Sequence, residues 1–302
     1  MATQTPPHRS VLPAEVLHAL IPISGGTYVD CTVGAGGHAE ALLDASAPDG
    51  RLIGIDADQD ALSLSATRLS RFGDRVQLVH ANYGDLEDVL AATGTGEVDG
   101  VLLDLGVSSM QLDQPDRGFS FQSDGPLDMR MDQTQGETAA SLVNGLPERA
   151  LADLIFTFGE ERFSRRIART IVARRAAARF ETTAALAAAV QTAIPGRSYH
   201  GLHPATRTFQ ALRIAVNSEL DGLTAVLPRA AESLKPGGRL AVISFHSLED
   251  RIVKRFLQGN KESLLAVTRK PLIASAEEQR ANPRSRSAKL RVAEKLAGVG
   301  LS

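Results

Sequence analysis

The chain has little cysteine and no long hydrophobic run. Its one cysteine, Cys31, excludes an internal disulfide framework. No apolar segment approaches the roughly 18 to 20 residues of a membrane span, and the first residues, MATQTPPHRS, lack the charged start and apolar core of a signal peptide. These absences favour a cytoplasmic protein with no membrane partner. The 302 residues are enough for one large or two modest globular domains.

The first 111 residues contain no lysine, five arginines and 15 acidic residues. By contrast, residues 250–302 carry 12 lysines and arginines against five acids, and residues 162–179 carry seven arginines and no acid. Such asymmetry indicates a polyanionic partner for the basic segments. The alternative explanation of this asymmetry is a set of solvated helix faces.

Short apolar runs alternate with helical segments in the first third of the chain. Strands are expected at 27–33, 51–56, 76–82 and 98–106, and helices between them at 37–46, 58–72 and 84–93. Nearly continuous Val, Ile and Leu in the strands is typical of a parallel sheet covered on both faces. The fold class is therefore α/β, with a doubly wound sheet.

After residue 111 this alternation stops. Helices are expected over 147–180 and 182–194, and then over 206–234 with an interruption at Pro228. A strand at 236–245 and a helix at 247–258 follow; Ser247 and Asp250 are expected to form the capping box of this helix. Two last strands lie within 264–272 and 287–296.

The simplest organisation is one α/β domain with an inserted helical piece. The first part of that domain is expected at 1–111, the mainly helical insertion at 112–205, and the second part at 206–302. The polar segment 102–132, LLDLGVSSMQLDQPDRGFSFQSDGPLDMRMD, is where the chain leaves the sheet.

A glycine turn, VGAGGHA, joins the first expected strand to a helix. Gly34, Gly36 and Gly37 permit a sharp turn and a close approach of a ligand to the backbone, although a plain strand–helix connection also uses glycine. Asp56 ends the next strand, where a carboxylate can accept both hydroxyls of an adenosine ribose. Together, the glycine turn and Asp56 favour an adenosine-type cofactor.

The expected site is acidic, with aspartates at the strand ends: Asp30, Asp56, Asp58 and Asp104. Acid opposes a dinucleotide pyrophosphate and suits a cation such as S-adenosylmethionine, which carries a sulfonium and an ammonium. Tyr83, which follows the third strand, either packs on the adenine or belongs to the core. Asp104 lies at the switch point of the sheet, or caps the turn after it. His38, in the first helical turn, is expected to offer its backbone N–H rather than acid–base chemistry.

Long motifs give the chain a more specific resemblance. They include TVGAGGHAEALL (32–43), GIDADQDAL (54–62), the segment 102–132, GEERFSRRIARTIV (159–172), HPATRTFQALRIAVNSEL (203–220), PGGRLAVISFHSLEDRIVKRF (236–256) and NPRSRSAKLRVAE (282–294). In these the chain resembles the bacterial 16S rRNA (cytosine-N4)-methyltransferase family, RsmH or MraW. The resemblance implies a Rossmann-like methyltransferase sheet with a helical insertion. It also implies S-adenosylmethionine as cofactor and, as substrate, a decoding-centre cytidine of 16S rRNA in the small ribosomal subunit or an assembly intermediate.

The resemblance also implies which residues contact the cofactor: Gly36, Gly37, His38, Asp56, Tyr83, Asp104 and Gln111. Tyr83 stands where some relatives have Phe, which keeps an aromatic face. The segment before residue 282 is shorter than in several relatives, so no role is assigned to it.

The catalytic group is less clearly marked. Many amino-group methyltransferases have a (D/N/S)-P-P-(Y/F/W) turn after the fourth strand, and this chain has DLGVSS from Asp104 instead. The hypothesis is that Asp104, or the carbonyls of Leu105 and Gly106, accept hydrogen bonds from cytosine N4.

Six arginines are candidates for RNA contact: Arg117, Arg130, Arg207, Arg213, Arg284 and Arg286. Arg207, Gln210, Arg213 and Asn217 share one helix face. For Arg130 the alternative is a surface loop tied by a pair with Asp128. No residues have the spacing of a metal site.

Other functions remain open: a methyltransferase acting on adenine N6, DNA or a protein amine; an NAD-dependent dehydrogenase; and a non-catalytic ribosome-assembly factor. The oligomeric state is expected to be monomer or homodimer.

Overall fold

The computed structural model describes residues 10–194 and 203–298. Its contacts divide the chain into two compact units, one of Met1–Gly106 with Leu220–Ser302 and the other of Val107–Glu219. We call them the sheet unit and the helical unit and describe each by itself. The division falls at 106/107 and 219/220, whereas the sequence placed its domain boundaries at 111/112 and 205/206; the domain assignment stays a prediction.

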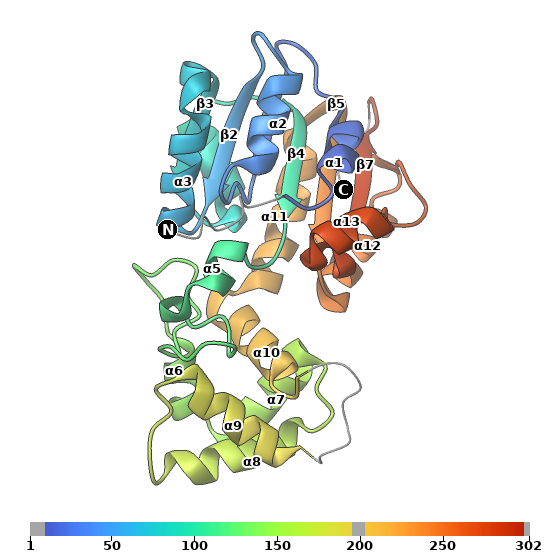
Figure 1. Ribbon diagram of the computed structural model, residues 1–302. Helices are drawn as coiled ribbons and strands as arrows, with labels where there is room; N and C mark the ends of the chain where they lie inside the picture. Colours follow the sequence, from blue (N-terminus) through green and yellow to red (C-terminus); the bar gives the residue numbers. More distant parts are fainter. Residues whose placement is uncertain (1–9, 195–202, 299–302) are drawn as a thin grey trace. The chain divides into compact units, whose positions relative to one another are not determined.

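The described residues of the sheet unit form a seven-stranded sheet in the order β3-β2-β1-β4-β5-β7-β6 (Figure 1). The strands are β1 Thr27–Asp30, β2 Arg51–Asp56, β3 Val76–His80, β4 Val98–Asp104, β5 Leu234–Ser244, β6 Leu264–Ala266 and β7 Lys289–Lys295. The first five run parallel, and β7 pairs antiparallel with both β5 and β6. The strand order reverses between β1 and β4, which creates a switch point at their carboxyl ends.

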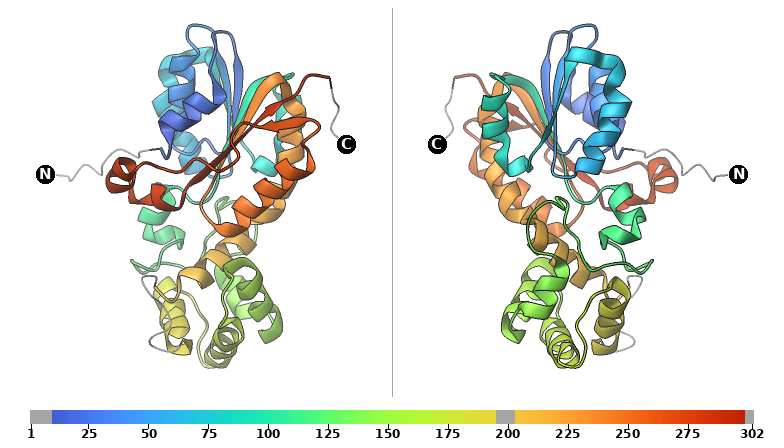
Figure 2. Two further views of the ribbon diagram at one scale, coloured as in Figure 1. Left: turned by 90° about the vertical axis from the view of Figure 1, so that its right-hand side faces the viewer. Right: turned by 90° about the vertical axis from the view of Figure 1, so that its left-hand side faces the viewer.

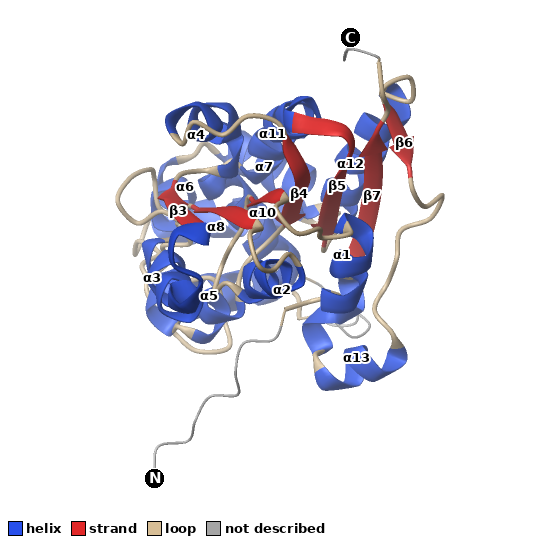
Figure 3. Ribbon diagram, turned by 90° about the horizontal axis from the view of Figure 1, so that it is seen from above, coloured by secondary structure: helices blue, strands red, loops and turns tan. Residues whose placement is uncertain are grey.

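Helices cover both faces of this sheet, as the view along it shows (Figure 3). One face packs against α1 (Pro13–Leu20), α2 (Gly37–Ala45) and α3 (Gln59–Leu69); the other packs against α4 (Leu86–Ala92), α11 (Glu219–Ser233) and α12 (Ser247–Gly259). Neighbouring strand residues alternate between the two cores: Tyr28 and Leu102 face the first, Val29 and Leu103 the second. Burial on both sides explains the continuous apolar strands. The remaining elements are η1 (Ser70–Arg75), η2 (Tyr83–Asp85), α13 (Ala276–Ala281) and η4 (Pro283–Ser287).

The helical unit has its own hydrophobic core, and the ribbon views show the helices that form this unit (Figures 1 and 2). Its elements are α5 Ser109–Asp113, η3 Pro115–Arg117, α6 Ala139–Gly145, α7 Glu148–Gly159, α8 Ser164–Arg175, α9 Thr183–Ala193 and α10 Thr206–Asn217. The expected run 147–180 is two helices, because Glu160 ends α7 with a left-handed φ of 48°. Ile155, Ile167 and Leu212 are fully buried in this core.

Two local expectations were wrong. The helical stretch 206–234 breaks at Ser218, which has a left-handed φ of 50°, and not at Pro228, which lies inside α11. Buried Leu223 and Ala230, one on each side of the proline, keep this helix packed on the sheet. The cap of α12 is His246, not Ser247: the Glu249 N–H donates to His246 Nδ1 (3.4 Å), and the His246 N–H donates to Glu249 Oε2 (3.2 Å).

Within residues 10–194 and 203–298, every helix is too short or too polar to cross a bilayer.

Candidate functional site

The glycine turn after β1 has the conformation that its sequence indicates. Gly34 and Gly36 have φ of 52° and 79°, which side chains other than glycine rarely adopt. Gly36 is the N-cap of α2, so Gly37 and His38 open the first turn, where backbone N–H groups have no partner within the helix. This brings three of the expected cofactor residues to the carboxyl end of β1.

Asp56, at the end of β2, is held by the backbone around it. Its Oδ2 accepts from the Gly34 N–H (2.8 Å) and its Oδ1 from the Asp58 N–H (2.9 Å). Burial raises the pKa of Asp56 to about 6, although these hydrogen bonds oppose the rise. Each carboxylate oxygen has a second lone pair, so the fixed carboxylate can still accept from a ribose. Asp58 has a different task, since it caps α3 by accepting from the Asp60 N–H (3.0 Å).

Asp30, His38 and Asp104 form an acidic cluster at the carboxyl ends of β1 and β4, in which Asp30 and His38 are buried and the Asp104 side chain is 22% exposed. His38 Nε2 lies 3.4 Å from Asp104 Oδ2, and the Asp104 N–H donates to Thr32 Oγ1 (2.6 Å). Asp30 is 1% exposed and its Oδ1 accepts from the Thr32 N–H (3.1 Å). Among the described residues, Asp30 Oδ2, Asp104 Oδ1 and His38 Nδ1 have no hydrogen-bond partner. A buried polar atom without a partner costs folding free energy, so three such atoms together indicate a binding site for a ligand.

The electrostatics of this cluster follow from its burial. Burial raises the pKa of Asp30 to about 7; the positive charge of His38 and the hydrogen bond from Thr32 lower it, while Asp104 and Asp56 add to the rise. Burial lowers the pKa of His38, but Asp104 and Asp30 together outweigh this and leave it raised. The cluster thus favours positive charge nearby.

Tyr83 begins η2, directly after β3 and its cap Asn82. Its ring packs in the core beside α4 and α11: a Cβ on Gly222 of α11 would meet Tyr83 Cε2 at 3.0 Å. Core packing is therefore observed, and contact with an adenine stays a prediction.

Gln111 belongs to the helical unit. It occupies the third position of α5 and completes a capping box with Ser108, whose N–H donates to Gln111 Oε1 (2.9 Å). Its expected contact with the cofactor stays a prediction.

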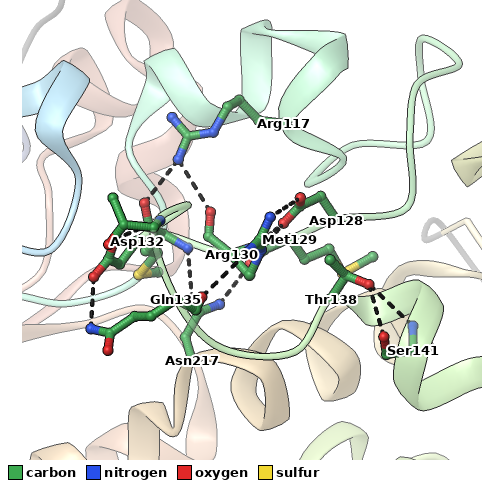
Figure 4. Close-up of polar contacts among 11 residues, drawn as sticks. Arg117, Asp128, Met129, Arg130, Asp132, Gln135, Thr138, Ser141 and Asn217 are labelled. Carbon is green, nitrogen blue, oxygen red and sulfur yellow. Dashed lines mark hydrogen bonds and ion pairs between the residues drawn. The ribbon is translucent and has the colours of Figure 1, made fainter.

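Four of the six candidate RNA-binding arginines lie in the helical unit, and each has partners there. Arg117 is 2% exposed and donates to the carbonyls of Arg130 (3.2 Å) and Met131 (3.0 Å) (Figure 4). Arg130 makes two bonds of 2.8 Å to Asp128. Arg213 makes two to Glu219, of 2.8 and 2.9 Å.

The expected polar stripe of α10 therefore holds its own unit together. Arg207 donates to the Glu160 carbonyl (3.0 Å) and Gln210 to the Phe158 carbonyl (3.1 Å). Asn217 accepts from the Met131 N–H (2.7 Å) and donates to the Met129 carbonyl (2.8 Å) (Figure 4). The other two candidates, Arg284 and Arg286, lie in η4 of the sheet unit. Contact of all six with RNA stays a prediction.

Comparison with known proteins bears on the whole chain. The sequence model of the MraW methylase family matches residues 5–296. The chain belongs to the MraW methylase family. It is 54% identical over 292 residues to a "Ribosomal RNA small subunit methyltransferase H" of Sorangium cellulosum, with 97% of this chain and 92% of that protein covered. A protein of the same name from Geobacter sp. (strain M21) is 52% identical over 307 residues, with 96% and 98% covered. The crystal structure of a putative rRNA methylase from Clostridium thermocellum has the same fold, with a TM-score of 0.50 at 15% identity over 95% of this chain and 98% of that one.

As a MraW methylase the protein is a methyltransferase, and the expected cofactor, S-adenosylmethionine, is confirmed with the family. The observed site fits this cation. Asp30 Oδ2 and Asp104 Oδ1 are buried acceptors without a partner among the described residues. They lie beside the glycine turn, where a Cβ atom added to Gly34 would have only the Thr32 carbonyl oxygen within 4 Å, at 3.8 Å. Negative charge stabilises a sulfonium and an ammonium, and the open space at Gly34 leaves room for a ligand to approach the backbone.

Asp30 is the site residue that sequence reasoning left without a role. Its position was noticed as one acidic strand end among several, but sequence does not tell which aspartate is buried. Asp58, two residues beyond the end of its strand, proves to be a helix cap, whereas Asp30, the last residue of β1, is enclosed with His38 and Asp104. The useful signal was its place directly before the glycine turn.

Proposed function

We propose that this MraW methylase transfers the methyl group of S-adenosylmethionine to N4 of a decoding-centre cytidine in 16S rRNA. The observation that carries the proposal is the match along nearly the whole chain to proteins named for methylating small-subunit ribosomal RNA. The cytidine and its N4 come from the resemblance in motifs. The enzyme would act in the cytoplasm, as a monomer or homodimer, on the small subunit or an assembly intermediate.

The proposed cofactor contacts are Gly36, Gly37, His38, Asp56, Tyr83, Asp104 and Gln111. The first N–H groups of α2 suit the carboxylate end of the cofactor, because a helix N-terminus favours negative charge. Asp56 accepts from the ribose hydroxyls. Asp104 and Asp30 face the cationic part of the cofactor, and this placement is supported by Asp30 Oδ2, a buried acceptor without a partner among the described residues.

When bound, S-adenosylmethionine supplies an electrophilic methyl group. Cytosine N4 is a weak nucleophile because its lone pair is delocalised into the ring, so the chain must place the nitrogen in line, roughly 3 Å from the methyl carbon. We assign the acceptor for the N4 hydrogens to Asp104, or to the carbonyls of Leu105 and Gly106. The fixed backbone of Asp104 and its free Oδ1 support this choice.

A stacked, paired cytosine cannot reach a methyl donor with its N4. The proposal therefore requires single-stranded or splayed RNA, with one base in the pocket. Arg117, Arg130, Arg207, Arg213, Arg284 and Arg286 are the proposed RNA contacts; for the first four, the observed partners mean that RNA would have to share or replace existing bonds.

The test is transfer of labelled methyl groups to small subunits isolated from cells without the enzyme, followed by mass spectrometry of the nucleosides. N4-methylcytidine at one 16S position is expected. Label in adenine N6, in DNA or in protein would refute the substrate, and no transfer at all would indicate an assembly factor. Binding of NAD with no binding of S-adenosylmethionine would support a dehydrogenase.

A further inference from the structure

The helical unit exposes a second set of arginines, in addition to the six candidates for RNA contact, within the arginine-rich segment 162–179. Arg165, Arg166 and Arg169 lie in the first turns of α8, Arg162 lies two residues before this helix, and all four side chains are exposed. Arg169 is 77% exposed. We call these four residues the α8 arginine face. They contrast with Arg117, Arg130 and Arg213, which are bound within the fold.

Helix geometry explains why these arginines point away from the core. The buried side of α8 consists of Ser164, Ile167, Ala168 and Ile171, at spacings of three and four residues. At 3.6 residues per turn, positions 165, 166 and 169 fall on the opposite side. The arginines further along are partly tied: Arg174 donates to Thr192 (3.1 Å) and Arg175 to the Val143 carbonyl (2.7 Å).

Little negative charge compensates this face. In the part of the chain that the structure describes, its single ion pair joins Arg169 to Glu148 at 3.7 Å, and both side chains are exposed. An ion pair between two exposed side chains contributes little to stability and leaves the arginine accessible. Arg162 stacks on the ring of Phe163, with its guanidinium 4.6 Å from the ring centroid. The neighbouring helix α9, TAALAAAVQTA, contains no acid.

We propose that the α8 arginine face binds phosphates of the RNA backbone outside the target nucleotide. The inference rests on the proposed function for its RNA partner. Guanidinium groups bind phosphate through two parallel hydrogen bonds and lose little hydration in doing so. The three arginines that project from α8, Arg165, Arg166 and Arg169, can each contact one phosphate of the strand.

The experiment compares two triple variants. In one, Arg165→Gln, Arg166→Gln and Arg169→Gln remove the face; in the other, Arg51→Gln, Arg71→Gln and Arg229→Gln remove three exposed arginines of the sheet unit, so the net charge is matched. Binding of unmodified 16S rRNA transcribed in vitro is measured from 50 to 200 mM KCl, together with methyl transfer to small subunits. Circular dichroism and melting establish that each variant is folded; the three single variants replace the triple if it is not.

Each phosphate contact to a single strand adds roughly 0.7 to the slope of log affinity against log salt, so the face variant should lose about 2 from this slope. Across a fourfold salt range the wild-type affinity should then fall about 16-fold more than that of the variant. The KM for RNA should rise, kcat should change little, and the control should match the wild type. Single variants should each lose about 0.7.

Equal slopes for the face variant and the control would overturn the inference. So would a loss confined to assembled subunits with naked rRNA binding unchanged, since that result indicates an acidic protein partner. The two proposals can fail separately. If the slope changes but no N4-methylcytidine forms, the proposed function fails and the face remains an RNA-binding surface. If N4-methylcytidine forms with an unchanged slope, only the face is refuted.

Discussion

Replacing Asp30 with asparagine tests whether the acidic cluster is prepared for a cation. Asp30 is 1% exposed, its Oδ2 has no partner among the described residues, and burial raises its pKa to about 7. Asparagine keeps the shape and the Oδ1 acceptor for the Thr32 N–H, but removes the charge. The variant should therefore be more stable than the wild type without cofactor, and should bind the cofactor less well.

The size of the effect on the free energy of unfolding depends on pH. Between the unfolded pKa of about 4 and the folded pKa of about 7 the folded protein holds this proton more tightly. Wild-type stability consequently falls as pH rises through that window, and the loss is complete above it. The linkage relation gives a destabilisation of about 2 kcal/mol at pH 5 and about 4 kcal/mol at pH 8. The Asp30→Asn variant should show neither of these destabilisations, because asparagine does not ionise.

Urea unfolding without cofactor at pH 5 and pH 8 measures this difference, with calorimetric titration of S-adenosylmethionine alongside. Asp44→Asn is the matched control, because Asp44 is 53% exposed on α2. The stabilising effect of Asp30→Asn should grow by roughly 2 to 3 kcal/mol from pH 5 to pH 8. An effect that is the same at both pH values, or that destabilises at pH 8, would refute the reasoning.

Three further predictions follow from other contacts. Asp104→Ala should abolish methyl transfer even with saturating cofactor; near-normal turnover under those conditions would mean that Asp104 only binds the cofactor. Asn217→Ala removes the hydrogen bonds to the Met129 carbonyl and the Met131 N–H and should destabilise the helical unit by about 1 to 3 kcal/mol in urea unfolding. An unchanged unfolding midpoint would show that these two bonds do not stabilise the unit. His246→Ala should cost about 1 kcal/mol of stability through loss of the α12 cap, whereas Ser247→Ala should cost less; the reverse order would favour the cap expected from sequence.

The sheet was predictable because its strands carry a strong local signal. Burial on both faces demands continuous apolar residues, and the expected 51–56 coincides with β2. The two wrong predictions, at Pro228 and Ser247, relied on local residue preferences that other contacts override. Pro228 disfavours a helix interior, but the buried residues on both sides keep α11 intact. Ser247 is a better cap by propensity, yet His246 with Glu249 provides the observed capping box.

The candidate site was predictable in outline only. The glycine turn and the aspartates at the strand ends bring several of the expected cofactor residues to one edge of the parallel part of the sheet, as the positions of Gly36, Asp56 and Asp104 show. Burial and pairing are not encoded by position. Sequence alone did not reveal that Asp30 is enclosed, or that Arg117 and Arg213 are engaged by the carbonyls and carboxylate of their own unit.

The central proposal is that the acidic side chains at the carboxyl ends of β1, β2 and β4 hold the methyl donor. A crystal structure of the protein grown with S-adenosylmethionine tests it most directly. We expect the ribose hydroxyls within hydrogen-bond distance of Asp56 and the cationic part of the donor beside Asp30 and Asp104. Adenosine bound elsewhere, with Asp30, Asp56 and Asp104 out of contact with it, would contradict this proposal.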